Sequence, residues 1–313
     1  MDRNSPENYC ETTDCSLSES KQIVQSILNM ASDLVKPVIT PRFVPTCSRE
    51  LMTGLGSLAA KHNLHIQTHL GENLRECDWV RQLEPDCKTY TSVYQKSNLL
   101  GPRTILAHCC HLEDTELEII KEAGAGVSHC PNSNFSLKSG ICDVRRLKYA
   151  GIKIGLGTDC SGGYSPSMLN AMRHAVMASN TLTFGKPESS HQPIQFSDAL
   201  FLATRGGAAL LDMEQEIGAL EEGMLADVLL VDMKGKSFVL LLDYIFIFFS
   251  QVMGQPLYLV MRLRQIWCTS LSSLQMTEIL PRSGWQARRS RILWNKMEMF
   301  CLAKKCKQSA SSV

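Results

Sequence analysis

The sequence predicts an α/β fold with a parallel sheet of the (β/α)-barrel type. Two observations predict it. First, short apolar runs alternate with segments of helical periodicity across residues 21–215, and this alternation is typical of βα units in a parallel sheet. Second, five apolar runs each end in a polar or charged side chain. In a (β/α) barrel the carboxyl ends of the strands are where the chemistry is assembled.

The elements follow in order. Residues 1–20 are rich in Ser, Thr, Glu, Asp and Asn, so we expect a disordered acidic head there. Apolar side chains at helical spacing predict a first helix over residues 20–33. The predicted strands cover residues 37–41, 64–70, 104–108, 126–130 and 152–157. The predicted helices lie near residues 48–62, 74–83, 113–123, 140–150, 165–180 and 198–213.

The end of the chain differs from this body. Residues 216–235 predict a turn followed by one more strand. Residues 236–313 have no clear periodicity, and from Arg262 onward they contain ten Lys or Arg against two Asp or Glu. We therefore expect a divergent basic tail over residues 236–313.

Composition narrows the function classes. The net charge of +1 predicts neither nucleic acid nor an anionic membrane surface as a partner. The longest apolar run, residues 238–250, is interrupted by Asp243 and is too short to span a bilayer. The thirteen cysteines form no Cys-x-x-Cys pair, and no signal peptide opens the sequence. These features favour a reducing, cytosolic location.

The second predicted strand offers a metal ligand and an acid. His69 lies near the end of the strand, and Glu72 follows it in the next loop. An imidazole there can bind a metal ion, and the carboxylate can take a proton from a metal-bound water and return it to a leaving nitrogen. The alternative is a buried histidine that caps the loop, with Glu72 as an N-cap partner of the next helix.

Two more strands end in reactive side chains. His108 closes the strand over residues 104–108, where a neutral imidazole can orient the attacking water or stabilise an oxyanion. Asp159 follows the last strand, just before a Gly-rich turn, where it can bind zinc through one carboxylate oxygen. Each of them can also be a structural residue at a strand end.

Two further stretches belong to the candidate site. The loop of residues 129–134 can line the pocket or brace a ligand from behind. Arg42 and Phe43 follow the first strand and offer a guanidinium and an aromatic face to a planar, carbonyl-bearing ring. The alternative for Arg42 is a solvated cation at a strand end. His111 has no evident role.

Taken in order, these motifs resemble the amidohydrolase superfamily, in the aminohydrolase branch that contains the mammalian guanine deaminases. The resemblance spans roughly residues 20–235, and its most specific stretches are TPRF at 40–43, HIQTHLGEN at 65–73, HCPNSN at 129–134 and GLGTDCSGGY at 155–164. It implies a zinc-dependent hydrolase with a (β/α)8 barrel and a small β domain. Residues 216–235 resemble the return of the chain into that small domain.

The resemblance also implies roles for the matched residues. The metal ligands would be His69 and Asp159, and the ion would be Zn²⁺. The catalytic groups would be Glu72 as the proton-shuttling acid, His108 beside the bound water, and Asp159.

The implied reaction is hydrolytic deamination of guanine to xanthine and ammonia, a step of purine catabolism. The groups that contact the substrate would be Arg42, Phe43, His69, Glu72 and Asp159.

One part of the family pattern is missing. The first strand of the family barrel ends in His-x-His, which supplies two further zinc ligands. The eight histidines of this sequence lie at positions 62, 65, 69, 108, 111, 129, 174 and 191, and no two are separated by a single residue. By order, the five predicted strands correspond to strands 4–8 of the family barrel. We therefore expect an N-terminally truncated chain with a partial barrel and a remnant of the small domain.

Three functional hypotheses follow. The first is a guanine deaminase-like hydrolase, although we expect little or no activity from this chain alone because two zinc ligands are missing. The second is an inactive isoform that acts only by binding a full-length partner or a PDZ domain. The third is a related aminohydrolase of another heterocycle. The family resemblance implies a homodimer, and the C-terminal Ser311–Val313 is of the kind that PDZ domains bind.

Overall fold

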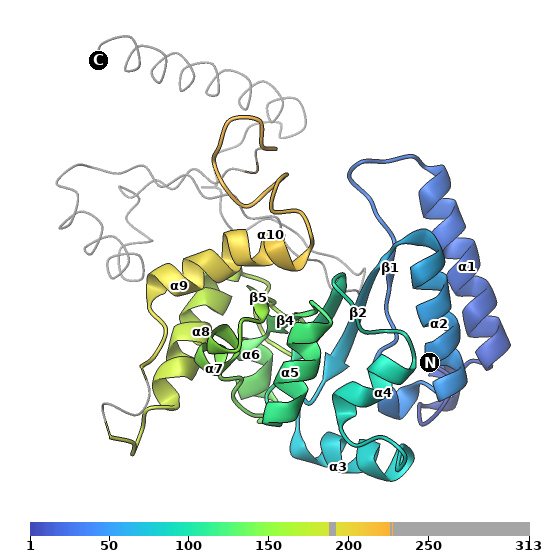
Figure 1. The fold of residues 1–313 in the computed structure, drawn as a ribbon, viewed down its shortest axis with the longest axis horizontal. Helices are drawn as coiled ribbons and strands as arrows, with labels where there is room; N and C mark the ends of the chain where they lie inside the picture. The colour runs from blue at the N-terminus through green and yellow to red at the C-terminus, as the bar shows by residue number, and fades with distance from the viewer. Residues whose placement is uncertain (188–191, 226, 228–313) are drawn as a thin grey trace, which may run out of the picture. The chain divides into compact units, whose positions relative to one another are not determined.

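The computed structural model describes residues 1–187, 192–225 and 227. The strands in this part of the chain are β1 (Val38–Ile39), β2 (His65–Leu70), β3 (Thr104–His108), β4 (Gly126–His129) and β5 (Lys153–Leu156). They pair in chain order, and every pair is parallel (Figure 1). The predicted α/β class with a parallel sheet is confirmed, and each strand lies within its predicted range.

Helices connect successive strands. The longer α-helices are α1 (Thr13–Asn29), α2 (Arg49–His62), α3 (Leu74–Leu83), α5 (Asp114–Glu122) and α8 (Met168–Thr181). The shorter α-helices are α4 (Tyr90–Lys96), α6 (Pro131–Ser136), α7 (Val144–Tyr149), α9 (Phe196–Phe201) and α10 (Gly207–Leu210). Two 3-10 turns and one π-helical turn complete the described elements: η1 (Glu7–Tyr9), η2 (Val44–Thr46) and η3 (Leu202–Gly206).

Side-chain caps fix where several helices begin. Ser48 accepts a hydrogen bond from the backbone N–H of Leu51 at the start of α2, and Asn73 accepts one from Glu76 at the start of α3. Such caps satisfy N–H groups that have no partner inside the helix. The cap on α3 directly follows Glu72, so it sets where the loop after β2 ends.

The N-terminal segment differs from the expected disordered head. Thr12 caps α1, which begins at Thr13. The Asp2 carboxylate accepts hydrogen bonds from the Ser48 backbone N–H at 2.7 Å, from the Ser48 hydroxyl at 2.5 Å and from the Thr13 hydroxyl at 2.8 Å. The composition of residues 1–20 indicates a solvated segment, but these bonds attach it to the start of α2.

Other differences from the predicted elements concern the helices and the end of the chain. The helix predicted over residues 198–213 is interrupted by η3 and continues as α10. The short helices α4 and α6 were not predicted. Residues 226 and 228–235 of the predicted turn and strand, and all of the predicted tail 236–313, lie outside the described residues. Within the range 216–235, residues 216–225 form turns. The backbone N–H of Leu225 donates a hydrogen bond to the Glu216 carbonyl at 2.9 Å.

The core lies where the helices pack on the sheet. Every residue of β3 and β4 is buried, as expected for central strands of a parallel sheet that is covered on both faces. Helices α1 and α2 lie beside the β1 end of the sheet, whereas α7, α8 and α10 contact β5 (Figure 1). No helix of the described chain is long and apolar enough to cross a membrane.

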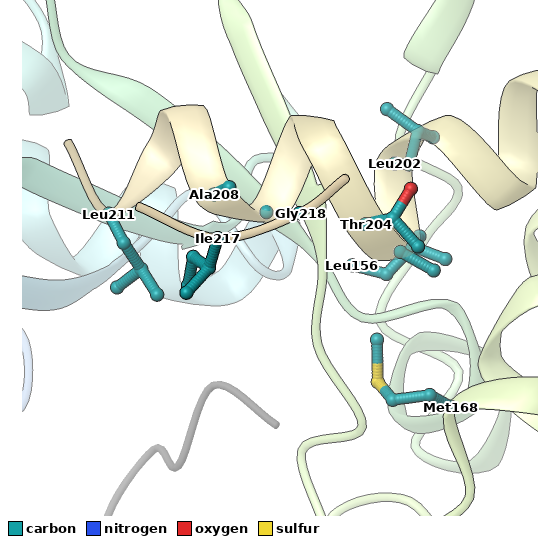
Figure 2. A pocket seen from close by; sticks show the side chains of 10 residues that line it. Leu156, Met168, Leu202, Thr204, Ala208, Leu211, Ile217 and Gly218 are labelled. Atoms are coloured by element: carbon teal, nitrogen blue, oxygen red, sulfur yellow. The ribbon is translucent and has the colours of Figure 1, made fainter. Parts of the chain in front are cut away.

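A pocket lies beside β5, lined by side chains of β5, α8, η3 and α10 and of the turn after α10 (Figure 2). Its lining includes Leu156, Met168, Leu202 and Ile217. None of the site residues predicted from the sequence lines it. The pocket is therefore distinct from the candidate site.

Candidate active site

The candidate site lies at the carboxyl ends of β2, β3 and β5. His69 is the last residue but one of β2, and His108 is the last residue of β3. The register of the sheet pairs Leu70 with His108, so the two strands end side by side. Asp159 lies three residues beyond the end of β5. The site is thus assembled from segments that are far apart in the sequence.

Four of the predicted side chains come together there. The Nε2 atom of His108 lies 3.9 Å from a carboxylate oxygen of Glu72 and 3.9 Å from a carboxylate oxygen of Asp159. The rings of His69 and His108 stack with their centroids 5.3 Å apart and their planes at 24°. His108 is 1% exposed. Two imidazoles and two carboxylates therefore share one small region.

The backbone of Arg42 orients the ring of His69. Nδ1 of His69 donates a hydrogen bond to the Arg42 carbonyl at 2.6 Å, and the backbone N–H of His69 donates to the same carbonyl at 3.1 Å. Burial lowers the pKa of His69, and the neighbouring His108 lowers it further. The ring is therefore neutral at pH 7, with its Nε2 lone pair free to act as a ligand or acceptor.

The side chains of Arg42 and Phe43 lie next to this ring. The Arg42 guanidinium lies 5.4 Å from the centroid of the Phe43 ring, within the range of a cation–π contact. The centroid of that ring is 6.2 Å from that of His69. A cation and an aromatic face thus lie beside His69 on the β1 side, with Arg42 exposed.

Glu72 is not an N-cap partner, because Asn73 provides the side-chain cap of α3. Instead the hydroxyl of Ser139 donates a hydrogen bond to Oε1 of Glu72 at 2.7 Å. The oxygen of Glu72 that lies near His108 is Oε2. The two carboxylate oxygens therefore have different surroundings.

His108 is held from α6, the short helix after β4. Its Nδ1 lies 2.8 Å from Oδ1 of Asn134, and both side chains are buried. Asn134 belongs to the stretch 129–134 that the sequence proposed as a brace. His129, at the start of the same stretch, is also buried, but neither of its ring nitrogens has a hydrogen-bond partner among the described residues.

Unusual backbone conformations occur at the strand ends. His108, Cys109 and Asp159 have φ values of +72°, +51° and +43°, a region that non-glycine residues rarely adopt. The loops after β2 and β3 are also tied together, because the Gly71 carbonyl accepts hydrogen bonds from the backbone N–H groups of Cys110 and His111. Strained conformations that are locked in this way tend to occur at functional sites.

Sequence reasoning missed Ser139 and left His111 without a role. Ser139 is an isolated serine in a loop, and no local pattern predicts its contact with Glu72. Asn134 was singled out only as part of its motif. His111, for which the sequence suggested no role, donates from Nε2 to the Ser139 carbonyl at 2.7 Å. Gly140 permits this approach, since a Cβ there would lie 2.5 Å from His111 Nε2.

The described residues of the site offer fewer donor groups than a zinc ion usually has. His69 and Asp159 have the donor chemistry of zinc ligands. However, no group of three or more His, Cys, Asp or Glu side chains within the described residues is arranged to hold a metal ion. Structural and catalytic zinc sites usually have at least three protein ligands. The described residues thus provide an incomplete ligand set.

Comparisons with known proteins show which family the chain resembles. A model of the amidohydrolase family matches residues 2–258. The guanine deaminase of Mus musculus is 45% identical over 224 residues, which are 72% of this chain and 49% of the mouse protein. The chain thus spans about half the length of the curated relatives it matches.

Solved structures show the same relationship. A guanine deaminase from C. acetobutylicum, with guanine bound in its active site, has a TM-score of 0.66 at 38% identity, covering 71% of this chain and 52% of that one. An adenosine deaminase from Xanthomonas campestris with bound zinc has a TM-score of 0.64 at 22% identity, covering 72% and 50%. The second likeness concerns the fold alone.

Proposed function

The chain belongs to the amidohydrolase family, and from this premise we propose that its site is built for hydrolytic deamination of guanine to xanthine and ammonia. The observation that carries the proposal is the convergence of Glu72 and Asp159 on Nε2 of His108, with His69 stacked beside it. The relatives at 44–45% identity are guanine deaminases, and the C. acetobutylicum enzyme has guanine in its active site.

The proposed roles follow from the surroundings of each group. Glu72 takes a proton from the attacking water and passes it to the purine ring and then to the leaving amine. His108 holds that water beside Glu72. Arg42 and Phe43, with His69, Glu72 and Asp159, contact the purine. One water molecule is consumed, and ammonia leaves from C2.

We propose Zn²⁺ as the cofactor, with His69 and Asp159 as two of its ligands. A bound zinc ion would supply a water molecule of lowered pKa. The neutral ring of His69, with Nδ1 bonded to the Arg42 carbonyl, fits this role. Because the described residues offer only two such ligands, we expect this chain alone to bind zinc weakly and to deaminate guanine little or not at all.

The second candidate is that this chain has no activity of its own and acts by binding another protein. The incomplete ligand set of the described residues favours it. The two candidates differ in what the site residues are for. In the first, Glu72 and His108 perform chemistry once the ligand set is complete. In the second, their contribution is to stability alone.

A two-part guanine assay separates these candidates. In the first part, the purified, zinc-loaded chain and its His69→Ala variant are compared for xanthine formation, and we expect no difference. In the second part, the matched half of the mouse enzyme is replaced by the matched segment of this chain. We expect the chimera to produce xanthine, and Glu72→Gln to lower its kcat by about 100-fold or more.

A folded, zinc-containing chimera that leaves guanine unchanged would contradict the proposed function. Turnover of adenine or a triazine in place of guanine would point to a related aminohydrolase. Xanthine formation by the chain alone, above its His69→Ala control, would contradict the expected dependence on further ligands.

We also propose a cytosolic location and a homodimer, both supported by the family resemblance. A PDZ domain is a further proposed partner. The Ser311–Val313 ending that supports it lies outside the described residues. If PDZ domains bind this ending through its carboxylate, deletion of Val313 abolishes pull-down by them. Equal pull-down of the intact and shortened chains would contradict the proposal.

A further inference from the structure

We propose that Asn134 and Ser139 are positioning residues that set the hydrogen-bonding state of His108 and Glu72 from one short segment. Asn134 keeps the proton of His108 on Nδ1, and Ser139 occupies Oε1 of Glu72, so that Nε2 and Oε2 are the working atoms. The chemical meaning of this inference rests on the proposed deamination. The hydrogen-bonding states themselves do not.

The environment of His108 supports the role proposed for Asn134. Nδ1 and Oδ1 of Asn134 are 2.8 Å apart, and both side chains are at most 2% exposed. An amide oxygen only accepts hydrogen bonds, so the ring donates from Nδ1 and a neutral ring has a lone pair on Nε2. A hydrogen bond to one ring nitrogen commonly fixes the tautomer of a functional histidine.

The surroundings of Glu72 support the role proposed for Ser139. The Ser139 hydroxyl donates to Oε1 at 2.7 Å, and Ser139 is 8% exposed. Oε2 is the oxygen that lies 3.9 Å from His108 Nε2. With Oε1 occupied, the carboxylate cannot turn freely to exchange its two oxygens. One defined oxygen therefore faces the reacting region.

The two positioning residues are physically linked. The backbone N–H of Ser139 donates to the Asn134 carbonyl at 2.9 Å, closing the turn that follows α6. The carbonyl of Ser139 in turn accepts the hydrogen bond from His111 Nε2 at 2.7 Å, which anchors the turn to the loop after β3. A single turn thus holds one group from the end of β3 and one from the loop after β2.

The hydrogen bond that His108 makes with Asn134 determines whether His108 donates or accepts a hydrogen bond at Nε2. When the ring has its one proton on Nδ1, Nε2 of His108, Oε2 of Glu72 and the nearby oxygen of Asp159 are all acceptors around one region. A molecule between them must donate hydrogen bonds, as the attacking water does with its two O–H groups and as the leaving ammonia does. In this state His108 orients water and does not donate to a developing oxyanion.

Nuclear magnetic resonance of the full chain tests this without substrate or metal. With ¹⁵N-labelled histidine, we expect His108 to show one tautomer, protonated at Nδ1. Asn134→Leu removes the acceptor oxygen and should give a mixture of tautomers or the Nε2-protonated form. Observation of Nε2–H in the unmodified chain, with the Asn134 amide reversed, would overturn the proposal, even if no variant folds.

The ¹³C resonance of the Glu72 carboxylate tests the role of Ser139. We expect Ser139→Ala to shift it and Ser139→Thr to retain the original position, because threonine keeps the hydroxyl. Ser136→Ala is the matched control, since the Ser136 hydroxyl bonds within its own helix to the Asn132 carbonyl at 2.8 Å. A Glu72 resonance unchanged by Ser139→Ala, or shifted equally by Ser136→Ala, would contradict the assignment.

The resonance experiments and the guanine assay of the chimera can fail independently of each other. An inactive chimera with a single Nδ1–H tautomer at His108 would refute guanine deamination and leave the positioning roles intact. An active chimera with Nε2–H at His108 would do the reverse.

Discussion

At the scale of single residues, the partner of each imidazole sets what it can do. His69 and His108 each have one ring nitrogen bonded to an oxygen, at 2.6 Å and 2.8 Å, which leaves the other nitrogen for function. His65 donates instead to the Leu211 carbonyl at 2.7 Å, from the start of β2, so its role is structural. His129 is buried without such a bond among the described residues.

His129 should make stability fall with decreasing pH. Burial, with a smaller contribution from His108, lowers its pKa from 6.5 to about 3. Between these values the unfolded chain binds a proton that the folded chain does not, so unfolding becomes more favourable as pH falls from about 6.5 toward 3. The slope is at most about 1.4 kcal/mol per pH unit. Urea unfolding at several pH values measures it.

The His129→Gln variant isolates this contribution. It keeps a polar side chain of similar size but cannot titrate, so its free energy of unfolding should depend less steeply on pH in that window. The carboxylates that also titrate there are common to both proteins and cancel in the comparison. Parallel curves for the two proteins would show that His129 is protonated in the folded state as readily as in the unfolded chain.

The sequence located the candidate residues that follow strand ends and missed Ser139, whose contact with Glu72 depends on the tertiary fold. His69, His108 and Asp159 follow apolar runs, and parallel strands bring their carboxyl ends together. Ser139 lies 67 positions from Glu72, and no periodicity connects them. The single tautomer proposed for His108 is likewise a property of the folded site, because it depends on the position of Asn134.

At the scale of elements, apolar runs located all five described strands, because the central strands are buried on both faces. Short helices such as α4 and α6 were missed because six or seven residues show too little of a helical period. The head over residues 1–20 shows the opposite error. Its polar composition concealed a helix that is capped by Thr12 and attached through Asp2.

The attachment of α1 through Asp2 can be tested by substitution. Asp2→Ala removes an acceptor of three hydrogen bonds, from Ser48 and Thr13, and should lower the free energy of unfolding by about 1 kcal/mol. It should also make α1 easier to cleave in limited proteolysis. Asp33→Ala, at an exposed position outside the helices, is the control and should change neither quantity. Equal stability of the two variants would contradict the proposed anchor.

At the scale of the whole molecule, the described strands form a sheet rather than a closed barrel. β1 and β5 each pair with one neighbour within the described residues, and β1 is only two residues long. In a complete (β/α)8 barrel every strand has two neighbours. The matched relatives are about twice as long as the segment they share with this chain.

The ties between the loops after β2 and β3 have a thermodynamic consequence. The carbonyls of Leu70 and Gly71 accept hydrogen bonds from the backbone N–H groups of residues 109–111. The conformational entropy of ordering these loops is therefore lost during folding and not during ligand binding. A ligand that binds between Glu72 and His108 meets groups already in place, and its affinity is not reduced by the cost of arranging them.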